Sequence, residues 1–386
     1  MTTNSASTDP IPPGTLKTLA GHVAALLLPV ATLAFLASGP HTPLAALSWT
    51  LPLWALVAAD VASPRYRGAP RLDRPSWPFD ALLYGLAGLQ FANIALMVRM
   101  VSLLDTTGPD SWIDVLCNLL AVRILVGTTS CCSGISVAHE LIHRRGHVPR
   151  LIGRALLSTV CYMHFAVEHL RGHHRHVGTA DDPATARLGE SYRAYWRRTK
   201  LEQFANAWRM ETGRLGVSAA RPRTLLRLIR HEVAIGLALQ IALVATIGAL
   251  AGPLAAAMFL LQALAAVRLL EAVNYFQHWG LRRDVDSLQA IDTWTTDSWV
   301  TQHVFVGLAR HADHHRNATT PYQMLRHCDQ GPSLPYGYFG MAFLAKSFNR
   351  RYQRRALAEL RDYRARQTQS RTATFRTADA GCRVVP

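Results

Sequence analysis

The sequence predicts an all-α integral membrane protein with about six transmembrane helices and a histidine-rich cap on the cytoplasmic side. Three observations lead to this fold class. Of the 386 residues, 49% are hydrophobic and 17% are charged, which is more apolar than a typical soluble domain. Six apolar runs are about 20 residues long, the length that a helix needs to cross a bilayer. Many of the 17 histidines fall in four short clusters near the water-facing ends of apolar stretches.

The order of the apolar runs and of the positive charges gives the topology. We predict spans at residues 18–38, 43–62, 79–98, 112–137, 233–251 and 254–276. The connection after the second span carries Arg65, Arg67, Arg71 and Arg74, whereas the first connection has no Lys or Arg. Because cytoplasmic loops of membrane proteins are enriched in Lys and Arg, the second connection is predicted to be cytoplasmic. The remaining connections then alternate between the two sides without contradiction.

One further apolar stretch, Leu151 to Val167, is not predicted to span. A full crossing there would place His169 on the opposite side of the membrane from His139 and His143, so we expect an interfacial or re-entrant helix. The Arg-rich stretch from Arg187 to Arg230 interleaves apolar and charged residues, which predicts amphipathic helices that lie against the membrane. All four histidine clusters are then expected on one face of the bilayer.

The predicted domain organisation follows from these spans. Residues 1–17 are rich in Thr, Ser and Pro, and we expect them to form a flexible N-terminal tail. Residues 18–345 are predicted to form a single six-span domain, with a cytoplasmic insertion at 139–232 and a cytoplasmic cap at 277–345. Residues 346–386 are predicted to form a basic C-terminal tail.

Charge and cysteine content narrow the classes of protein. Lys and Arg outnumber Asp and Glu by 41 to 25, which gives a formal charge of +16 and is compatible with nucleic acid, anionic lipid or an acidic protein partner. The apolar spans favour membrane lipid and an acidic protein, with no nucleic acid. None of the six cysteines forms a C-x-x-C pair, which argues against an internal rubredoxin-like iron site, a zinc ribbon or a thioredoxin-type motif.

The histidine clusters are the main candidate functional residues. His139 and His143 are four residues apart, so a helix would project both side chains from one face toward a shared metal. Neutral imidazole binds divalent transition metals well. The clustered histidines exceed the needs of one ion, which predicts a two-metal site at a membrane surface. The nine candidate ligands are His139, His143, His169, His173, His174, His278, His311, His314 and His315.

Two other classes of metal protein match part of this pattern. The run from His139 to His143 also fits the H-E-x-x-H motif of zinc metallopeptidases, in which Glu140 would be the general base. A zinc hydrolase has no need of seven further clustered histidines. A metal transporter would place its ligands along a path near the bilayer midplane, whereas these clusters gather at one surface. The pattern therefore disfavours both classes.

The clusters and their flanking residues resemble those of a known family. The matching stretches are H-E-L-I-H-R from His139, E-H-L-R-G-H-H-R-H-V-G-T-A-D-D-P-A-T-A-R from Glu168, N-Y-F-Q-H-W-G-L from Asn274 and A-R-H-A-D-H-H-R-N-A-T-T-P-Y-Q-M-L-R from Ala309. Over roughly residues 20–345, the chain resembles the membrane-bound alkane 1-monooxygenases. These enzymes are part of a wider group of histidine-box di-iron hydroxylases and desaturases.

This resemblance implies a non-haem di-iron site, two iron ions held by the nine histidines. It implies no bridging carboxylate, so Glu140, Glu168 and Asp313 within the clusters are expected to orient the imidazole N–H groups. Gln277 stands beside His278 where the family usually has Glu. A neutral amide there would lower the negative charge near the irons, so the resemblance does not fix the substrate as a linear alkane.

The implied activity is a monooxygenase reaction. One atom of O2 is inserted into an unactivated C–H bond of an apolar substrate, and the other atom is reduced to water. The expected substrate is a medium- or long-chain alkane, hydroxylated at a terminal carbon. Fatty-acyl desaturation, oxidative decarboxylation and hydroxylation of an aromatic methyl group are alternatives within the wider group. The expected location is the bacterial cytoplasmic (inner) membrane, with the site on the cytoplasmic side.

Electrons must come from another protein, because the chain has no flavin, nicotinamide or cysteine-cluster motif of its own. The resemblance implies rubredoxin or ferredoxin with its reductase. An acidic carrier could dock electrostatically on the basic cytoplasmic segment, although attraction to anionic head groups explains the same charges equally well. The basic residues of that segment are Arg187, Arg193, Arg197, Arg198, Lys200, Arg209, Arg214, Arg221, Arg223, Arg227 and Arg230.

Two further features of the spans suggest contacts near the site. Arg268 and Glu271 are three residues apart in the last span, so we expect them to pair, because an isolated charge within a span is costly. Bulky side chains could limit how deep a substrate chain lies, although packing or interfacial anchoring is the simpler explanation for each. These side chains are Trp49, Trp54, Phe91 and Phe165.

Overall fold

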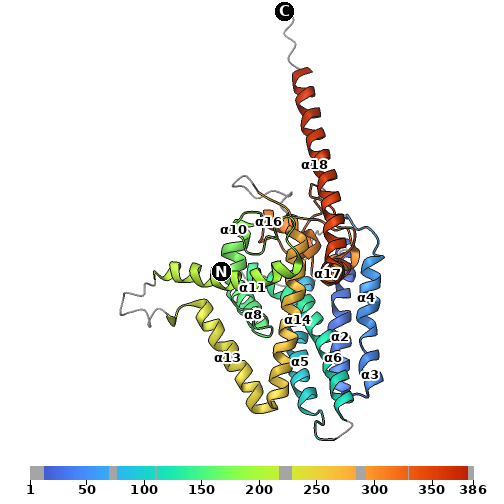
Figure 1. Ribbon diagram of the computed structural model, residues 1–386, viewed down its shortest axis with the longest axis vertical. Coiled ribbons are helices and arrows are strands. Elements are labelled where there is room, and N and C mark those ends of the chain that lie inside the picture. Colours follow the sequence, from blue (N-terminus) through green and yellow to red (C-terminus); the bar gives the residue numbers. More distant parts are fainter. Residues whose placement is uncertain are drawn as a thin grey trace, which may run out of the picture.

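The structure, a computed structural model, is helical, as predicted (Figure 1). It describes residues 13–68, 76–108, 111–216, 228–283, 293–328 and 330–380, with side chains up to residue 366. Within these ranges, extended pairing is limited to two isolated bridges, Arg65 with Ser298 and Thr295 with Ser333. Long helices run side by side in a bundle, and shorter helices cover one end of it.

In the described chain, six helices are long and apolar enough to cross a membrane, and they coincide with the six predicted spans. The first span consists of α1 (Pro13–His22), a 3-10 turn and α2 (Leu27–Ser38). The second consists of α3 (Pro43–Ser48) and α4 (Leu51–Val61). The other spans are α5 (Trp77–Ser102), α6 (Ser111–Thr129) continued by α7 (Ser136–His143), α13 (Glu232–Ala251) and α14 (Pro253–His278).

Helix α13 shows why these helices need an apolar environment. Its side chains Leu250, Ile241 and Leu239 have exposed fractions of 84%, 61% and 54%. Apolar surface of this extent is unfavourable in water, at about 25 cal/mol per Å², and contiguous patches of it are rare on soluble monomers. The chain turns between α13 and α14 at Gly252, whose φ of 86° is readily adopted by glycine. The fold is therefore that of an integral membrane protein.

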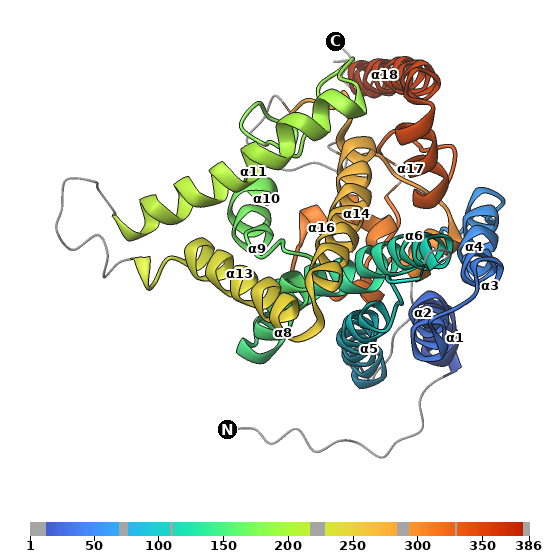
Figure 2. The same cartoon turned by 60° about the horizontal axis from the view of Figure 1, so that its bottom comes forward.

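Shorter helices gather at the end of the bundle where α7 and α14 stop (Figure 1). In Figure 2, α9, α10 and α16 lie around α14. The helix α18 projects away from the bundle (Figure 1). The helices outside the six spans are α8 (His147–Ser158), α9 (Phe165–Glu168), α10 (His174–His176), α11 (Tyr192–Leu215), α15 (Trp299–Val304), α16 (His311–Arg316), α17 (Tyr338–Ser347) and α18 (Asn349–Ala380).

The apolar stretch Leu151 to Val167 does not form a span, as predicted. Helix α8 has 12 residues and is therefore about 18 Å long, too short for a hydrocarbon core of about 30 Å. The chain turns at Cys161, whose φ is 51°, and continues as α9 from Phe165. Helix α8 packs against α7, so the second histidine cluster follows on the same side as the first.

Both ends of the chain differ from the predicted tails. Helix α1 begins at Pro13 and buries Thr15, so the expected flexible tail of residues 1–17 is too long; residues 1–12 lie outside the described residues. The basic segment after residue 345 forms the 32-residue helix α18. Its many Arg and Ala residues are strong helix formers, and the prediction considered the positive charge of this segment but not its helix propensity.

A π-helical turn, Ser130–Ile135, interrupts the fourth span just before the first histidine cluster. Gln90 of α5 donates to Ser130 Oγ at 2.9 Å, and Ser130 donates to Gln262 Oε1 of α14 at 2.9 Å. All three side chains are buried. In a low dielectric such a paired network is strong, so it holds the wider π turn and fixes the rotation at which α7 presents its histidines.

Asp60, near the end of α4, connects the cap to the bundle. Its side chain is buried, and Oδ1 accepts hydrogen bonds from Ser298 Oγ at 2.6 Å and Thr301 Oγ1 at 2.8 Å. Oδ2 accepts from the backbone N–H groups of Phe339 at 2.9 Å and Gly340 at 3.3 Å. These N–H groups belong to the first turn of α17 and have no partner within that helix. One carboxylate thus joins α4, α15 and α17.

We expect Asp60→Ala to destabilise the protein by about 3 kcal/mol or more, because each hydrogen bond to a charged acceptor contributes about 1.5–3 kcal/mol. The measurement is the free energy of unfolding of the purified protein in detergent. Asp114→Ala is the matched control, since Asp114 is an exposed carboxylate in the first turn of α6. Equal stability of the two variants would contradict the connecting role of Asp60.

Candidate metal centre

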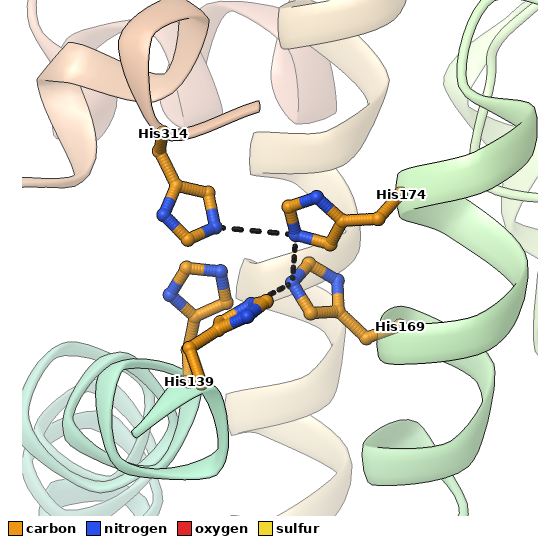
Figure 3. A group of neighbouring side chains, drawn as sticks. His139, His169, His174 and His314 are labelled. Atoms are coloured by element: carbon orange, nitrogen blue, oxygen red, sulfur yellow. Dashed lines mark hydrogen bonds between the residues drawn. The ribbon is translucent and has the colours of Figure 1, made fainter. Parts of the chain in front are cut away.

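The nine histidines singled out from the sequence lie together in two groups that could each hold a metal ion. Within each group the candidate ligand atoms lie within 4.8 Å of one another. Figure 3 shows four rings of the first group pointing toward one another. The first group is His139, His143, His169, His174 and His314, and the second is His173, His278, His311 and His315.

The Nε2 atoms of the first group converge on one region. Nε2 of His169 lies 3.1 Å from that of His143 and 3.1 Å from that of His174. Nε2 of His174 also lies 3.2 Å from that of His314 (Figure 3). A ring nitrogen carries either one N–H or one lone pair, so neither His169 nor His174 can make both contacts as ordinary hydrogen bonds. Lone pairs directed at a shared cation account for this geometry.

The second group has the same character and lies beside the first. Nε2 of His311 and Nε2 of His315 are 2.9 Å apart, and among the described atoms the buried Nε2 of His173 has no hydrogen-bond partner. The ring centroids of His174 and His315, one from each group, are 4.6 Å apart. The two candidate sites are therefore adjacent, and each consists of imidazoles alone.

Burial keeps these imidazoles in the form that binds metals. Burial first, and then the positive charge of neighbouring histidines, lowers the pKa of five of them well below the usual value. A ring with so low a pKa is neutral at pH 7 and has a free lone pair, which is the form required of a metal ligand. The five histidines are His169, His174, His311, His314 and His315.

A second π-helical turn, His169–His173, distributes the second cluster between the two groups. A π-helix bonds residue i to residue i+5, so its turn is wider than that of an α-helix. This width brings His169 and His174, five residues apart, into the same group, while His173 belongs to the other. In an ordinary α-helix, residues five apart point in different directions.

The sequence analysis overlooked Asp182. Its buried carboxylate accepts a hydrogen bond from Nδ1 of His173 at 2.9 Å and from Thr185 Oγ1 at 2.6 Å. Burial alone would raise the pKa of Asp182 and lower that of His173, but each group reverses the effect on the other, so the pKa of Asp182 is lowered and that of His173 raised. With its proton on Nδ1, His173 has Nε2 left for a metal.

Two of the carboxylates expected to orient imidazoles, Glu140 and Asp313, contact other groups. Glu140 forms an ion pair with Arg144 at 2.7 Å, and Asp313 accepts from the backbone N–H of Arg326 at 2.9 Å. One carboxyl oxygen of Glu168 has no hydrogen-bond partner among the described atoms, and burial, with the nearby Asp182, raises the pKa of Glu168 to about 8. Among the described carboxylates, Asp182 from the loop after α10 contacts one of the nine histidines, and the orienting roles of Glu140, Glu168 and Asp313 stay predictions.

The expected pair of Arg268 and Glu271 does not form. Buried Glu271 accepts hydrogen bonds from the hydroxyls of Tyr162 and Tyr195, both at 2.9 Å. The Arg268 guanidinium lies over the ring of Trp196, 5.6 Å from its centroid. Glu271 thus ties α14 to α11 and to the turn before α9, while Arg268 makes a cation–π contact.

Gln277 lies where an apolar cavity meets both histidine groups. The cavity has a volume of about 20 Å³, enough for about one water molecule. Phe165 is part of its wall and stacks on His169 with ring centroids 4.7 Å apart, whereas Trp54 and Phe91 are partly exposed elsewhere. Its lining residues are Ile135, Ser136, His139, Phe165, His169, Leu270, Asn274, Gln277, Leu308 and His311.

Comparison with known proteins identifies the family. A family model described as fatty acid desaturase matches residues 115–345, which include all nine histidines. Alkane 1-monooxygenase 1 of Pseudomonas aeruginosa is 41% identical over 227 residues, which are 57% of this chain and 58% of that protein. Alkane 1-monooxygenase of Acinetobacter baylyi is 32% identical over 295 residues, which are 74% of this chain and 68% of that protein. This chain belongs to the alkane 1-monooxygenase family.

More distant similarity reaches beyond the alkane 1-monooxygenases. The xylene/toluene monooxygenase hydroxylase component of Pseudomonas putida is 26% identical over 285 residues, 73% of each chain. The match to the Pseudomonas aeruginosa relative spans 58% of that protein's length. The family model spans the stretch of this chain that holds all nine histidines.

We expect Asp182→Ala to lower the affinity of the second histidine group for metal by about 10- to 100-fold, because the carboxylate that orients His173 is lost. The measurement is the metal content of purified protein after dialysis against increasing chelator concentrations. Asp181→Ala is the matched control, because Asp181 is the exposed neighbour. Identical metal retention in the two variants would rule out the orienting role of Asp182.

Proposed function

We propose that this protein is a non-haem di-iron monooxygenase of the bacterial cytoplasmic membrane. Its substrate is an apolar molecule such as a medium- or long-chain alkane, hydroxylated at a terminal C–H bond with O2. The observation that carries the proposal is the pair of adjacent, all-imidazole groups at the ends of membrane-length helices. Residues 18–345 would form the oxygenase domain, with its site on the cytoplasmic side.

The nine histidines would hold two irons, five imidazoles on one and four on the other. The fit rests on the crowded Nε2 atoms and on the neutral state of the buried rings. Iron bound there would supply the activation of O2 and of the C–H bond. A site made of nitrogen ligands alone could bind iron, copper, nickel or zinc. The resemblance to the histidine-box di-iron enzymes favours iron.

The remaining residues position the ligands and exclude water. Asp182 holds the proton of His173 on Nδ1. Phe165, Leu270 and Leu308 surround the point where both histidine groups meet the cavity, so the reacting end of an apolar substrate would be kept dry. Because the cavity is about 20 Å³, a hydrocarbon chain can enter only if wall side chains such as Phe165 rotate.

Two related activities have specific support. The similarity to a xylene/toluene monooxygenase component favours hydroxylation of an aromatic methyl group as a second candidate. The fatty acid desaturase family model raises desaturation of a fatty-acyl chain, and oxidative decarboxylation belongs to the same wider group. Alkane hydroxylation is preferred because the alkane 1-monooxygenases are the more similar relatives.

Product analysis tests these activities against one another. Purified, iron-loaded protein with rubredoxin, a reductase and NADH is incubated with octane, hexadecane, p-xylene and a free fatty acid, and products are identified by mass spectrometry. We expect a primary alcohol from at least one alkane. An alkene from the fatty acid, with no oxygenated product from any hydrocarbon, would contradict the proposal.

An electron carrier would dock on a groove beside the second histidine group. The groove has a volume of about 650 Å³ and lies between the loop at Leu188 and the start of α18. Trp279, which follows His278 directly in the chain, forms part of it, and the exposed Arg350 and Arg354 line it. Positive charges around an apolar groove fit an acidic rubredoxin or ferredoxin.

We assign docking of the electron carrier to this groove instead of to part of the basic segment that was predicted from the sequence. On α11, Arg198 is paired with Glu190 and Glu202, and Arg214 with Glu211, so these charges are partly neutralised. Arg221, Arg223 and Arg227 lie outside the described residues. The first turns of α18 expose four arginines that the sequence analysis had assigned to a tail: Arg350, Arg351, Arg354 and Arg355.

We expect the double variant Arg350→Glu and Arg354→Glu to weaken carrier binding about 10-fold at low salt, and less at high salt because exposed charges are screened. Binding of reduced rubredoxin is measured by surface plasmon resonance. Arg361→Glu, an exposed position farther along α18, is the control. If the double variant instead loses affinity for anionic vesicles and keeps carrier binding, these arginines contact lipid.

A further inference from the structure

The side chain of Gln277 has one polar atom without a hydrogen-bond partner in the part of the chain that the structure describes. Gln277 is 1% exposed and lies on α14 next to His278. Its Nε2 donates a hydrogen bond to the hydroxyl of Tyr338. Its Oε1 has no hydrogen-bond partner among the described atoms. A buried carbonyl oxygen without a donor costs about 1–3 kcal/mol, so its retention suggests that a ligand supplies the donor.

The hydrogen bonds of Tyr338 fix the orientation of this amide. The Tyr338 hydroxyl donates its single hydrogen to the backbone carbonyl of Leu308 at 2.9 Å, and a carbonyl can only accept. The phenolic oxygen therefore has only its lone pairs left and must accept from Gln277. If the amide were turned around, two oxygens without a hydrogen between them would face each other. Nε2 is thus held toward Tyr338, and Oε1 is the atom left to the cavity.

The surroundings of the cavity define which ligand could use this oxygen. Gln277, His139, His169 and His311 line it together with apolar side chains. The other polar groups have partners of their own, since Ser136 donates to the carbonyl of Cys131 at 3.2 Å and Asn274 donates to Glu271 at 3.4 Å. A volume of about 20 Å³ holds one water molecule, so a larger ligand reaches Oε1 only when wall side chains such as Phe165 rotate. Such a ligand must be mostly apolar and must carry a hydrogen-bond donor close to the histidines.

We propose that Oε1 of Gln277 accepts a hydrogen bond from the hydroxyl group of a bound aliphatic alcohol. The proposal rests on the proposed function, because a hydrocarbon has no donor and acquires one when its terminal carbon is hydroxylated. Gln277 is then a positioning residue that distinguishes the alcohol from the parent chain. A carboxylate at this position could not donate to Tyr338 when ionised, so the amide and the Tyr338–Leu308 bond are matched in this chain.

Equilibrium binding without an electron donor tests this assignment, because no turnover occurs. The ligands are 1-octanol and 1-fluorooctane, which are similar in size but differ in having a hydrogen-bond donor. The protein is the full-length, iron-loaded chain in lipid nanodiscs, and the readout is the ratio of the two dissociation constants. We expect the wild-type preference for octanol to fall about 5-fold in Gln277→Met, the loss of one hydrogen bond.

Two further variants make the test decisive. Tyr338→Phe releases the amide and should also lower the preference, so it substitutes for Gln277→Met if that variant does not fold. Gln302→Met is the control, because Gln302 is another buried glutamine whose Oε1 has no partner among the described atoms, and it lies outside the residues that line this cavity. Its octanol preference should equal that of the wild type.

The outcomes separate this inference from the proposed function. An octanol preference that falls in Gln277→Met and Tyr338→Phe but not in Gln302→Met supports the inference. The same preference in all four proteins overturns it and leaves the proposed function standing, with the cavity holding water alone. If the wild-type protein binds neither ligand, the proposed function fails as well.

Discussion

The structure depends on bringing nine imidazoles to one place. Burial keeps five of the rings neutral, and the close approach of their ring nitrogens is unfavourable unless a cation is bound. The ligands therefore come from elements that the fold holds rigidly: the ends of α7 and α14, a π-helical turn with α10, and the short helix α16. The two adjacent groups are a consequence of how these four segments meet.

The fold supplies this rigidity at the border between membrane and water. The buried network of Gln90, Ser130 and Gln262 fixes the π turn ahead of α7, and Asp60 holds α15 and α17 against α4. Apolar side chains such as Leu270 line the cavity at the histidines, while Arg350 and Arg354 line a separate groove at the start of α18. In the proposed function, the cavity receives the apolar substrate and the groove receives the electron carrier.

Periodicity and spacing predicted the parts of the molecule that local sequence determines. Hydropathy located the six spans, because a helix in lipid must be apolar along about 20 residues, and clustering located the nine histidines. The link between His173 and Asp182 was missed because it spans a loop, and nothing in that loop marks one of its two aspartates as buried. The π-helical turns were missed because they differ from α-helix only in backbone hydrogen bonding, which residue spacing does not reveal.

The contacts of two side chains differ from those that their neighbours in the sequence suggested. Gln277 was noted only as a neutral replacement for a carboxylate, and its unpaired oxygen became visible once Tyr338 and Leu308, far along the chain, were placed beside it. Glu271 was expected to pair with Arg268 from their spacing, but two tyrosines from outside its helix reach it instead. In both cases contacts distant in sequence decide the role of the side chain.

The metal content of the purified full-length protein tests the central claim most directly. Elemental analysis combined with Mössbauer spectroscopy of protein grown in iron-57 counts the ions and reports their ligands. We predict two irons per chain in nitrogen-rich sites. Substitution of the histidines of either group should remove both irons. A single tightly bound zinc ion, or one iron per chain that survives substitution of His173 and His315, would contradict the two-metal centre.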